Sequence, residues 1–153
     1  MSNAVIAVAS DHGGFVLKAS LSEELKRLGY TVLDLGTHSG DSVDYPDFGY
    51  RIAAALAEGK ATIGVAMCGS GIGISMAANR YPWVRAALCH DVTSARLSRE
   101  HNDANVIAFG ERLTGVEVAK EALRAFLSTP FAGNRHAARV EKLGAPPQIP
   151  SVS

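Results

Sequence analysis

The chain contains the stretch Thr62-Ile-Gly-Val-Ala-Met67, followed directly by Cys68-Gly-Ser-Gly-Ile-Gly73. The first six residues form a short apolar run, which is typical of a strand buried on both faces of a parallel sheet. The glycines that follow allow a tight turn, and a helical pattern then continues through Asn79. A strand, a glycine turn and a helix in this order predict one unit of an α/β fold.

The same alternation of strand and helix patterns repeats along the chain. Apolar runs at 5–9, 31–35, 84–88 and 105–109 alternate with helical patterns at 15–28, 45–58, 91–99, 114–127 and 134–143. This predicts a Rossmann-like, five-stranded parallel sheet with helices on both faces and the strand order 2-1-3-4-5. In such sheets ligands bind beyond the carboxyl ends of the strands, where the strand order reverses. Asp91 is expected to cap one helix, and Thr114 to Glu117 to form a capping box at the next.

The bulk composition is that of an ordinary globular chain. Its 153 residues are 47% hydrophobic and 20% charged, and we expect one domain over residues 1–145 and a mobile, Pro-rich tail over 146–153. With 15 basic and 15 acidic residues, a nucleic-acid or membrane-surface role is disfavoured. No apolar run approaches the roughly 20 residues that cross a bilayer, and the N-terminus lacks the basic region of a signal peptide. Two cysteines without CxxC spacing indicate neither a disulfide framework nor a zinc site, so a reducing cytoplasm is expected.

Polar and glycine-rich segments follow three of the predicted strands: Asp11-His12-Gly13-Gly14, Cys68 to Gly73, and Phe109-Gly110-Glu111-Arg112. Successive backbone N–H groups in a glycine loop before a helix can form an anion site. A cysteine at the mouth of such a loop favours a functional thiol. The spacing matches neither a Walker A loop nor a dinucleotide fingerprint, and the arginine of a tyrosine-phosphatase loop is missing. A glycine turn after a strand is by itself as often structural as functional, and the cysteine favours the functional interpretation, an anion site beside a functional thiol.

Each candidate residue also has a structural interpretation. Cys89 ends an apolar run and is expected to pack in the core. His12, in Asp-His-Gly-Gly at a strand end, favours a functional role. Asn102 is explained equally well as a helix C-cap or as a ligand-binding residue. Arg135 and Arg139 lie four residues apart on one helical face, which is either a solvated surface or a binding site.

Six segments, taken together, closely resemble the ribose-5-phosphate isomerase type B family: Asp11–Phe15, Asp44–Pro46, Cys68–Gly73, Ser98–Asn105, Phe109–Arg112 and Arg135–Arg139. The related galactose-6-phosphate isomerase subunits share much of this pattern. The resemblance covers residues 4 to 143, in order and at compatible spacing. It implies aldose–ketose interconversion of ribose 5-phosphate and ribulose 5-phosphate through an enediolate, without a metal or a cofactor.

The resemblance also implies a role for individual residues. Cys68 resembles the base that moves a proton between C1 and C2, and Ser70 the hydroxyl residue that holds the sugar. His101 resembles the residue that opens the furanose ring, with Asp11 in support. The sugar, phosphate or enediolate would be bound by His12, Tyr45, Gly69, Gly71, Gly73, Asn102, Arg112, Arg135 and Arg139. One branch of the family has a glutamate in place of this cysteine, just after the last loop glycine; here that position is Ile74, so the cysteine branch fits better.

The family forms homodimers or homotetramers whose sites combine residues from two chains, so the resemblance implies such an assembly here. Three alternatives remain. The first is isomerisation of a six-carbon 6-phosphosugar such as allose or galactose 6-phosphate. The second is a non-catalytic sugar-phosphate-binding subunit, against which Cys68, Ser70 and His101 together argue. The third is a cysteine-based phosphotransfer enzyme, which the missing arginine near Cys68 disfavours.

Overall fold

The computed structural model describes residues 4–151. Residues 1–3, at the start of the segment in which no signal peptide was expected, and residues 152–153, at the end of the expected tail, lie outside it. The five apolar runs form strands: β1 (Val5–Ser10), β2 (Thr31–Asp34), β3 (Ile63–Cys68), β4 (Ala86–Leu88) and β5 (Val106–Gly110). All of them pair in parallel in one sheet with the order β2-β1-β3-β5-β4. The expected five-stranded, Rossmann-like parallel sheet is therefore confirmed.

The expected order of the last two strands is wrong. β3 pairs with β5 and not with β4, and β4 lies at the edge of the sheet. All five residues of β5 are buried, as a central strand requires, whereas the three residues of β4 are only half-buried. A three-residue strand offers little ladder to two neighbours, so the longer and more apolar β5 takes the central place. The expected pairing of β1 with β3 is confirmed.

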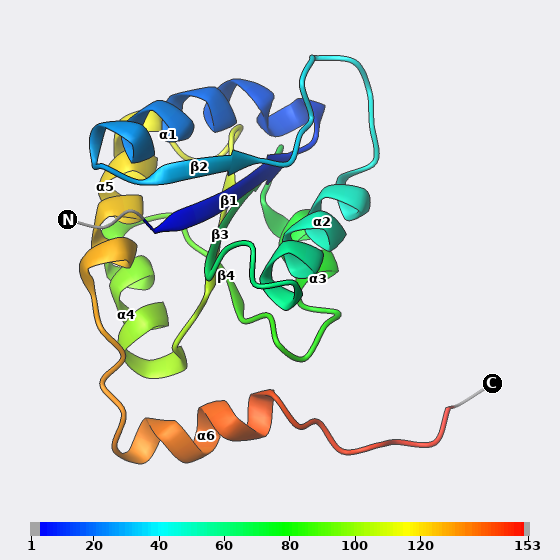
Figure 1. Cartoon of the computed structure of the whole chain (residues 1–153), viewed down its shortest axis with the longest axis vertical. Coiled ribbons are helices and arrows are strands. Elements are labelled where there is room, and N and C mark those ends of the chain that lie inside the picture. Colours follow the sequence, from blue (N-terminus) through cyan, green and yellow to red (C-terminus); the bar gives the residue numbers. More distant parts are fainter. Residues whose placement is uncertain (1–3, 152–153) are drawn as a thin grey trace.

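Helices cover both faces of the sheet (Figure 1). One face holds α1 (Phe15–Arg27), α4 (Val92–Asn102) and α5 (Val116–Ser128). The other holds α2 (Tyr45–Ala57) and α3 (Ile72–Ala78). A short 3-10 turn, η1 (His12–Gly14), lies between β1 and α1. No helix within residues 4–151 has the length and apolar character needed to span a membrane.

The two faces of the central strands carry side chains of different size. Successive residues of a strand point to opposite faces. Large side chains of β1, β3 and β5 pack toward α1, α4 and α5: Ile6, Val8, Val65, Met67, Ile107 and Phe109. Mostly small ones pack toward α2 and α3: Ala9, Ala66, Cys68, Val106 and Ala108. Cys68 therefore belongs to the α2–α3 face, and it is the last residue of its strand.

The two helix starts that the sequence analysis singled out differ in outcome. Asp91 caps α4 as expected, because its Oδ1 accepts a hydrogen bond of 2.6 Å from the N–H of Ser94. The capping box at α5 is wrong, since the N-cap is Gly115 and no side chain caps it. The hydroxyl of Thr114 instead lies 3.3 Å from Nδ1 of His90. That contact competes with the cap for the hydroxyl.

The last helix, α6 (Arg135–Leu143), lies apart from the two helical layers and below α4 in Figure 1. His136 is its single buried residue. The ring of His136 stacks on the ring of His101 at the end of α4, with 4.4 Å between centroids and 15° between planes. The N–H of Ala132 also donates to the carbonyl of Glu100 over 3.0 Å. Few contacts therefore hold α6 to α4.

Candidate active site

The carboxyl ends of β1, β3 and β5 meet at one edge of the sheet, where a cavity of about 530 Å³ opens. It is lined by Asp11, His12, Gly13, Tyr45, Cys68, Gly69, Ser70, Ile72, Gly73, Met76, Arg112 and Leu113. We call this cavity the carboxyl-edge pocket. The lining includes most of the side chains that the sequence analysis singled out at strand ends. Their gathering follows from the parallel topology, because the strands end at the same edge.

Cys68 is nearly buried, with 4% of its surface exposed. Its Sγ accepts a hydrogen bond of 3.1 Å from the backbone N–H of Gly71. Hydrogen bonds to charged acceptors are stronger than those to neutral ones, so this N–H would stabilise the sulfur whenever it is deprotonated. Gly71 has a φ of +76°, and a Cβ there would lie 2.6 Å from Leu88. Only glycine can therefore bring this N–H to the sulfur.

The other residues of the glycine loop face different neighbours. Oγ of Ser70 accepts a hydrogen bond of 3.2 Å from the N–H of Ile72, which fixes the hydroxyl at the pocket. A Cβ on Gly73 would overlap the ring of Tyr45, so glycine lets this ring lie against the loop. A Cβ on Gly69 would meet only the side chain of Arg112, at an ordinary 3.5 Å. Packing thus explains why positions 71 and 73 are glycine, and the role of Gly71 and Gly73 in substrate binding stays a prediction.

Asp11 and His12 reach the pocket from the end of β1. Oδ1 of the buried Asp11 accepts a hydrogen bond of 3.2 Å from the N–H of Gly14 and so caps η1. Nδ1 of His12 accepts a hydrogen bond of 3.1 Å from the N–H of Val43. Because Nδ1 is an acceptor, the neutral ring carries its proton on Nε2. His12 can therefore donate a hydrogen bond to an anion in the pocket.

The loop that supplies Val43 starts at a half-buried ion pair. Nζ of Lys18, on α1, lies 2.6 Å from Oδ1 of Asp34, at the end of β2. The same Oδ1 accepts a hydrogen bond of 2.9 Å from the N–H of Gly36. Burial raises the pKa of Asp34, but the hydrogen bonds from Lys18 and Gly36 together leave it lowered. The carboxylate thus stays ionised and fixes the start of the loop that orients His12.

Arg112 contributes the positive charge of the pocket. Its backbone N–H donates to the carbonyl of Gly69 over 3.0 Å, and its exposed side chain lies over that glycine. The N–H of Glu111 likewise donates to the carbonyl of Cys68 over 3.0 Å. The loop after β5 is therefore joined directly to the loop after β3. The backbone of Arg112 is thus held at the pocket, and its guanidinium group suits bidentate binding of phosphate or carboxylate.

Four other predicted site residues do not line this pocket. His101 and Asn102 form the last turn of α4, and Arg135 and Arg139 lie on α6. α4 starts near the carboxyl edge of the sheet and runs back, so its end lies at the amino edge. The structure of one chain therefore places these residues at the opposite edge from Cys68. Together with His136 they form what we call the α4–α6 cluster.

Burial and charge act together on His136. Desolvation lowers the pKa of this imidazole, and the neighbouring His101, Arg135 and Arg139 lower it further, while Glu100 opposes the shift. The residue is 8% exposed. His136 is therefore expected to be neutral at neutral pH, which suits a stacked position beside two guanidinium groups.

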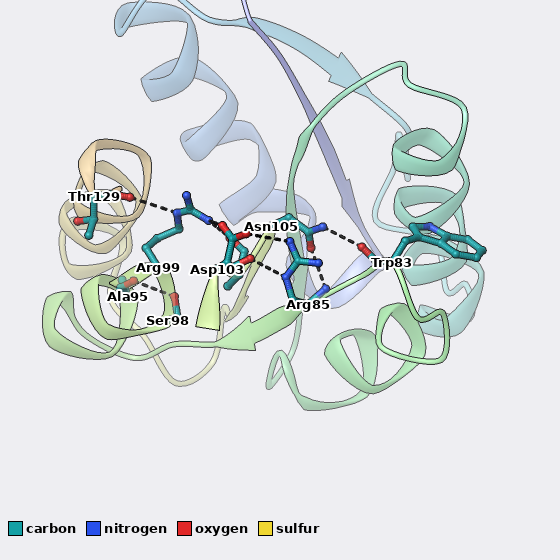
Figure 2. A network of polar contacts seen from close by, with 9 residues as sticks. Trp83, Arg85, Ala95, Ser98, Arg99, Asp103, Asn105 and Thr129 are labelled. Carbon is teal, nitrogen blue, oxygen red and sulfur yellow. Dashed lines mark hydrogen bonds and ion pairs between the residues drawn. The ribbon is translucent and has the colours of Figure 1, made fainter. Parts of the chain in front are cut away.

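A polar network holds the turn that follows His101 and Asn102 (Figure 2). Asp103, with a φ of +46°, is the C-cap of α4, so Asn102 is the last helical residue and not the cap. Arg99 donates to Oδ1 of Asp103 over 2.9 Å and to the carbonyl of Ala104 over 2.6 Å. Arg85 donates to the carbonyl of Asp103 over 2.7 Å. The end of α4 is thus fixed from two sides.

Some residues at the two sites were not singled out from the sequence. Ile72, Met76 and Leu113 give the pocket its apolar wall, and Val43 orients His12. The four-residue spacing of Ile72 and Met76 on a helix that begins in the pocket was an available signal. The contact of Val43 joins segments 31 residues apart, and no local pattern encodes it. Within residues 4–151, no three His, Cys, Asp or Glu side chains gather as metal ligands would.

Comparison with known proteins adds to this geometry. A family model described as Ribose/Galactose Isomerase matches residues 6–143. The chain belongs to this isomerase family. One relative, the ribose-5-phosphate isomerase B of Escherichia coli (strain K12), is 44% identical over 140 residues, 92% of this chain and 94% of that protein. The galactose-6-phosphate isomerase subunit LacB of Clostridium acetobutylicum is 42% identical over 127 residues, 83% of this chain and 73% of that protein.

A solved structure of the same family supports the fold assignment. The ribose-5-phosphate isomerase B of Clostridium thermocellum superposes with a TM-score of 0.90 at 49% sequence identity. The match covers 92% of this chain and 95% of that chain. The family and its Rossmann-like fold are therefore established for this chain, which is an isomerase.

Proposed function

We propose that this isomerase interconverts ribose 5-phosphate and ribulose 5-phosphate. The observation that supports this most is Cys68, at the floor of a pocket that also holds His12 and Arg112. A thiol beside two groups suited to phosphate is what an aldose–ketose isomerase of phosphosugars needs. The relatives named ribose-5-phosphate isomerase B, at 44% and 49% identity, support the five-carbon substrate.

In the proposed reaction Cys68, as a thiolate, removes the proton from C2 of the open-chain aldose. The electron pair moves into an enediolate, and the proton then returns to C1 to give the ketose, so the atoms balance without a redox partner. Ser70 holds the sugar hydroxyls and passes a proton between O1 and O2. A positioned base of this kind contributes about 10²- to 10⁴-fold to a rate.

Backbone N–H groups of residues 69 to 73 would stabilise the enediolate oxygen, as an oxyanion hole does. Two of these groups already have acceptors: Gly71 donates to Sγ of Cys68, and Ile72 to Oγ of Ser70. The oxygen would therefore be bound by the remaining N–H groups of the loop. Tyr45, against Gly73, would line the sugar site.

The phosphate would be bound by His12 and Arg112 from this chain. Nε2–H of His12 is available as a donor because Nδ1 accepts from Val43. The guanidinium of Arg112 supplies charge and a forked pair of donors. Anchoring the phosphate at one end of the substrate fixes C1 and C2 at the other end, near the sulfur.

The α4–α6 cluster completes the proposed site from a second copy of the chain. His101 would open the furanose ring with the help of Asp11, Asn102 would bind the sugar, and Arg135 and Arg139 would add two phosphate ligands. Within one chain these residues lie at the other edge of the sheet, so they reach a pocket only if copies pair. We therefore propose a homodimer, or a homotetramer built from such pairs, with two-fold closed contacts.

Isomerisation of a six-carbon 6-phosphosugar is a second candidate. The galactose-6-phosphate isomerase subunit LacB, at 42% identity, favours it. A non-catalytic binding subunit is a weaker candidate, because it has no need of a thiol at the pocket floor.

A coupled assay with purified protein in the presence of EDTA tests the proposal. Ribose 5-phosphate, allose 6-phosphate, galactose 6-phosphate and free ribose are compared at equal concentrations. Turnover of ribose 5-phosphate should exceed that of the 6-phosphosugars and persist with EDTA. Faster turnover of a 6-phosphosugar would transfer the assignment to the second candidate, and equal use of free ribose would refute phosphate anchoring.

A further inference from the structure

Glu111 connects three segments around the carboxyl-edge pocket. Its Oε1 accepts a hydrogen bond of 2.7 Å from the backbone N–H of Leu17, which is 94 residues away. Its own N–H donates to the carbonyl of Cys68 over 3.0 Å. Its neighbour Arg112 donates through the backbone to Gly69 over 3.0 Å. One residue therefore touches the start of α1 and the loop after β3, and it directly precedes the pocket arginine.

The α1 end of this connection is close to His12. α1 begins at Phe15, directly after η1, so Leu17 lies in its first turn. The N–H groups of a first helical turn have no partner within the helix, and Glu111 supplies one from outside. Because η1 joins His12 rigidly to α1, the carboxylate fixes the segment of His12 relative to that of Arg112.

The hydrogen bond from Leu17 also determines where the carboxylate of Glu111 lies. A carboxylate next to a phosphate-binding arginine would compete with phosphate for its guanidinium group. Here the carboxylate is turned to the N-terminus of a 13-residue helix, where the helix dipole favours negative charge. The guanidinium of Arg112 is left to the pocket, and no ion pair links it to Glu111 within residues 4–151.

We infer that Glu111 is a positioning residue, which sets the spacing of His12 and Arg112 around Cys68 through its bond to Leu17. The inference rests on the proposed function, because it assigns the two residues to one phosphate. It differs from a purely stabilising helix cap in what it predicts. A cap affects the unfolding temperature alone, whereas a positioning residue affects phosphate binding through Arg112.

Steady-state kinetics and calorimetric titration with inorganic phosphate test this on the full chain. Glu111→Ala should raise KM, and weaken phosphate binding, by about tenfold, since misplacing an anchoring group costs about this much or more. Glu111→Gln keeps an oxygen at the same reach and should stay within about twofold of the wild type. Glu111→Asp keeps the charge but is one methylene too short, so it should resemble Glu111→Ala.

The double variant Glu111→Ala/Arg112→Ala tests whether Glu111 affects phosphate binding through Arg112. If Glu111 acts through Arg112, the double variant should bind phosphate no more weakly than Arg112→Ala alone. If the double variant weakens phosphate binding by the product of the two single effects, the inference is overturned. A normal Glu111→Asp beside an impaired Glu111→Gln would overturn it as well. Should Glu111→Ala fail to fold, Glu111→Gln and Glu111→Asp still show whether phosphate binding depends on the position of the side-chain oxygen or on its charge.

Glu24→Ala is the matched control. Glu24 lies on the same helix and joins it to α5 through Arg124, over 2.7 Å, but far from the pocket. It should lower the unfolding temperature and leave KM unchanged; an equal rise in KM would make Glu111 merely structural. The phosphate titration needs no turnover, so it still tests Glu111 if ribose 5-phosphate proves not to be the substrate. Failure of the wild type to bind phosphate would refute both.

Discussion

The carboxyl-edge pocket and the α4–α6 cluster are held in place by different means. The pocket residues follow directly from central strands, and backbone hydrogen bonds join their loops: Glu111 to Cys68 and Arg112 to Gly69. The α6 part of the cluster is attached to α4 by one imidazole stack and one backbone hydrogen bond, from Ala132 to Glu100, and it has a single buried residue. The pocket is therefore part of the fold itself, whereas few contacts within the chain hold the helix that carries Arg135 and Arg139.

From this difference we expect separate tasks for the two regions. Proton transfer between two carbon atoms needs close placement of the base, which the end of a central strand provides. Phosphate carries a high charge and several acceptor oxygens, so arginine side chains can bind it in more than one arrangement. We therefore expect the reacting sulfur in the rigid region and part of the phosphate binding in the loosely attached one, and the variants below separate the two tasks.

The largest effect is expected at Cys68. Cys68→Ala should lower kcat by about 10²- to 10⁴-fold, because the base is lost. The variant should stay folded and still bind a phosphosugar, since His12 and Arg112 remain; calorimetric titration with ribose 5-phosphate checks this. A variant that keeps about a tenth of the wild-type kcat would show that Cys68 is not the base.

Cys89→Ala is the control for this variant. Cys89 is 1% exposed and packs in the core, and burial raises the pKa of its thiol, which makes it unreactive. Its replacement should cost some stability and little activity. A large loss of turnover from Cys89→Ala would mean that the wrong thiol had been assigned.

The arginines should show a smaller effect, mainly on KM. Arg112→Ala in the pocket and Arg139→Ala in the cluster should each raise KM for ribose 5-phosphate by about tenfold, since each removes charge-assisted hydrogen bonds. Lysine at either position should recover only part of the loss, because it lacks the fork geometry. If Arg139→Ala leaves KM unchanged while Arg112→Ala raises it, the cluster does not bind the substrate.

Mixing two impaired variants tests whether one site uses both regions from different chains. The assay uses ribose 5-phosphate far below KM, so that the raised KM of Arg139→Ala lowers its rate. When Cys68→Ala and Arg139→Ala chains pair at random, about half of the dimers are mixed, and each mixed dimer has one intact and one doubly damaged site. Activity should recover to about a quarter of the wild type, measured after co-expression. If a mixture confirmed to contain heterodimers is no more active than the average of the two variants assayed separately, sharing is refuted and the isomerase assignment stays intact.

Most of the polar residues that line the carboxyl-edge pocket were predictable from the sequence. Asp11, Cys68 and Arg112 follow apolar runs directly, and parallel strands bring their carboxyl ends together. The position of β4 was not predictable in this way, because an apolar run shows that a strand exists but not which strand it pairs with. Its three half-buried residues identify it as an edge strand only once the pairing is known.

Contacts between distant segments were also beyond the sequence patterns. The stack of His101 on His136 joins two helices through side chains that a local pattern treats as surface. The motif at Thr114 and Glu117 fits a capping box, yet Thr114 contacts His90. Roles that came from the family resemblance, such as ring opening by His101, remain predictions. The type of a side chain indicates which contacts it can make, and the tertiary structure decides which partner it contacts.

The smallest effect is expected from the pH dependence of α6. The pKa of His136 is lowered in the docked helix, so the docked state binds fewer protons than the undocked one. Docking is therefore strongest above pH 6.5, the ordinary value for histidine, and weakens as the pH falls through the interval down to the lowered value. Hydrogen exchange of the α6 amides, corrected for the intrinsic rate, should show less protection at pH 5.5 than at pH 7.5.

Burial of His136, and then its charged neighbours, fix the sign of this effect on its pKa. His101, Arg135 and Arg139 all disfavour a second positive charge, and only Glu100 opposes them. His136→Phe keeps a flat ring for stacking but carries no proton, so it should remove the pH dependence of α6 protection while keeping α6 docked. His38→Phe, in an exposed loop away from α6, should leave it unchanged. If α6 protection in His136→Phe still falls at low pH, another group controls docking, and the loose attachment of the cluster does not depend on this imidazole.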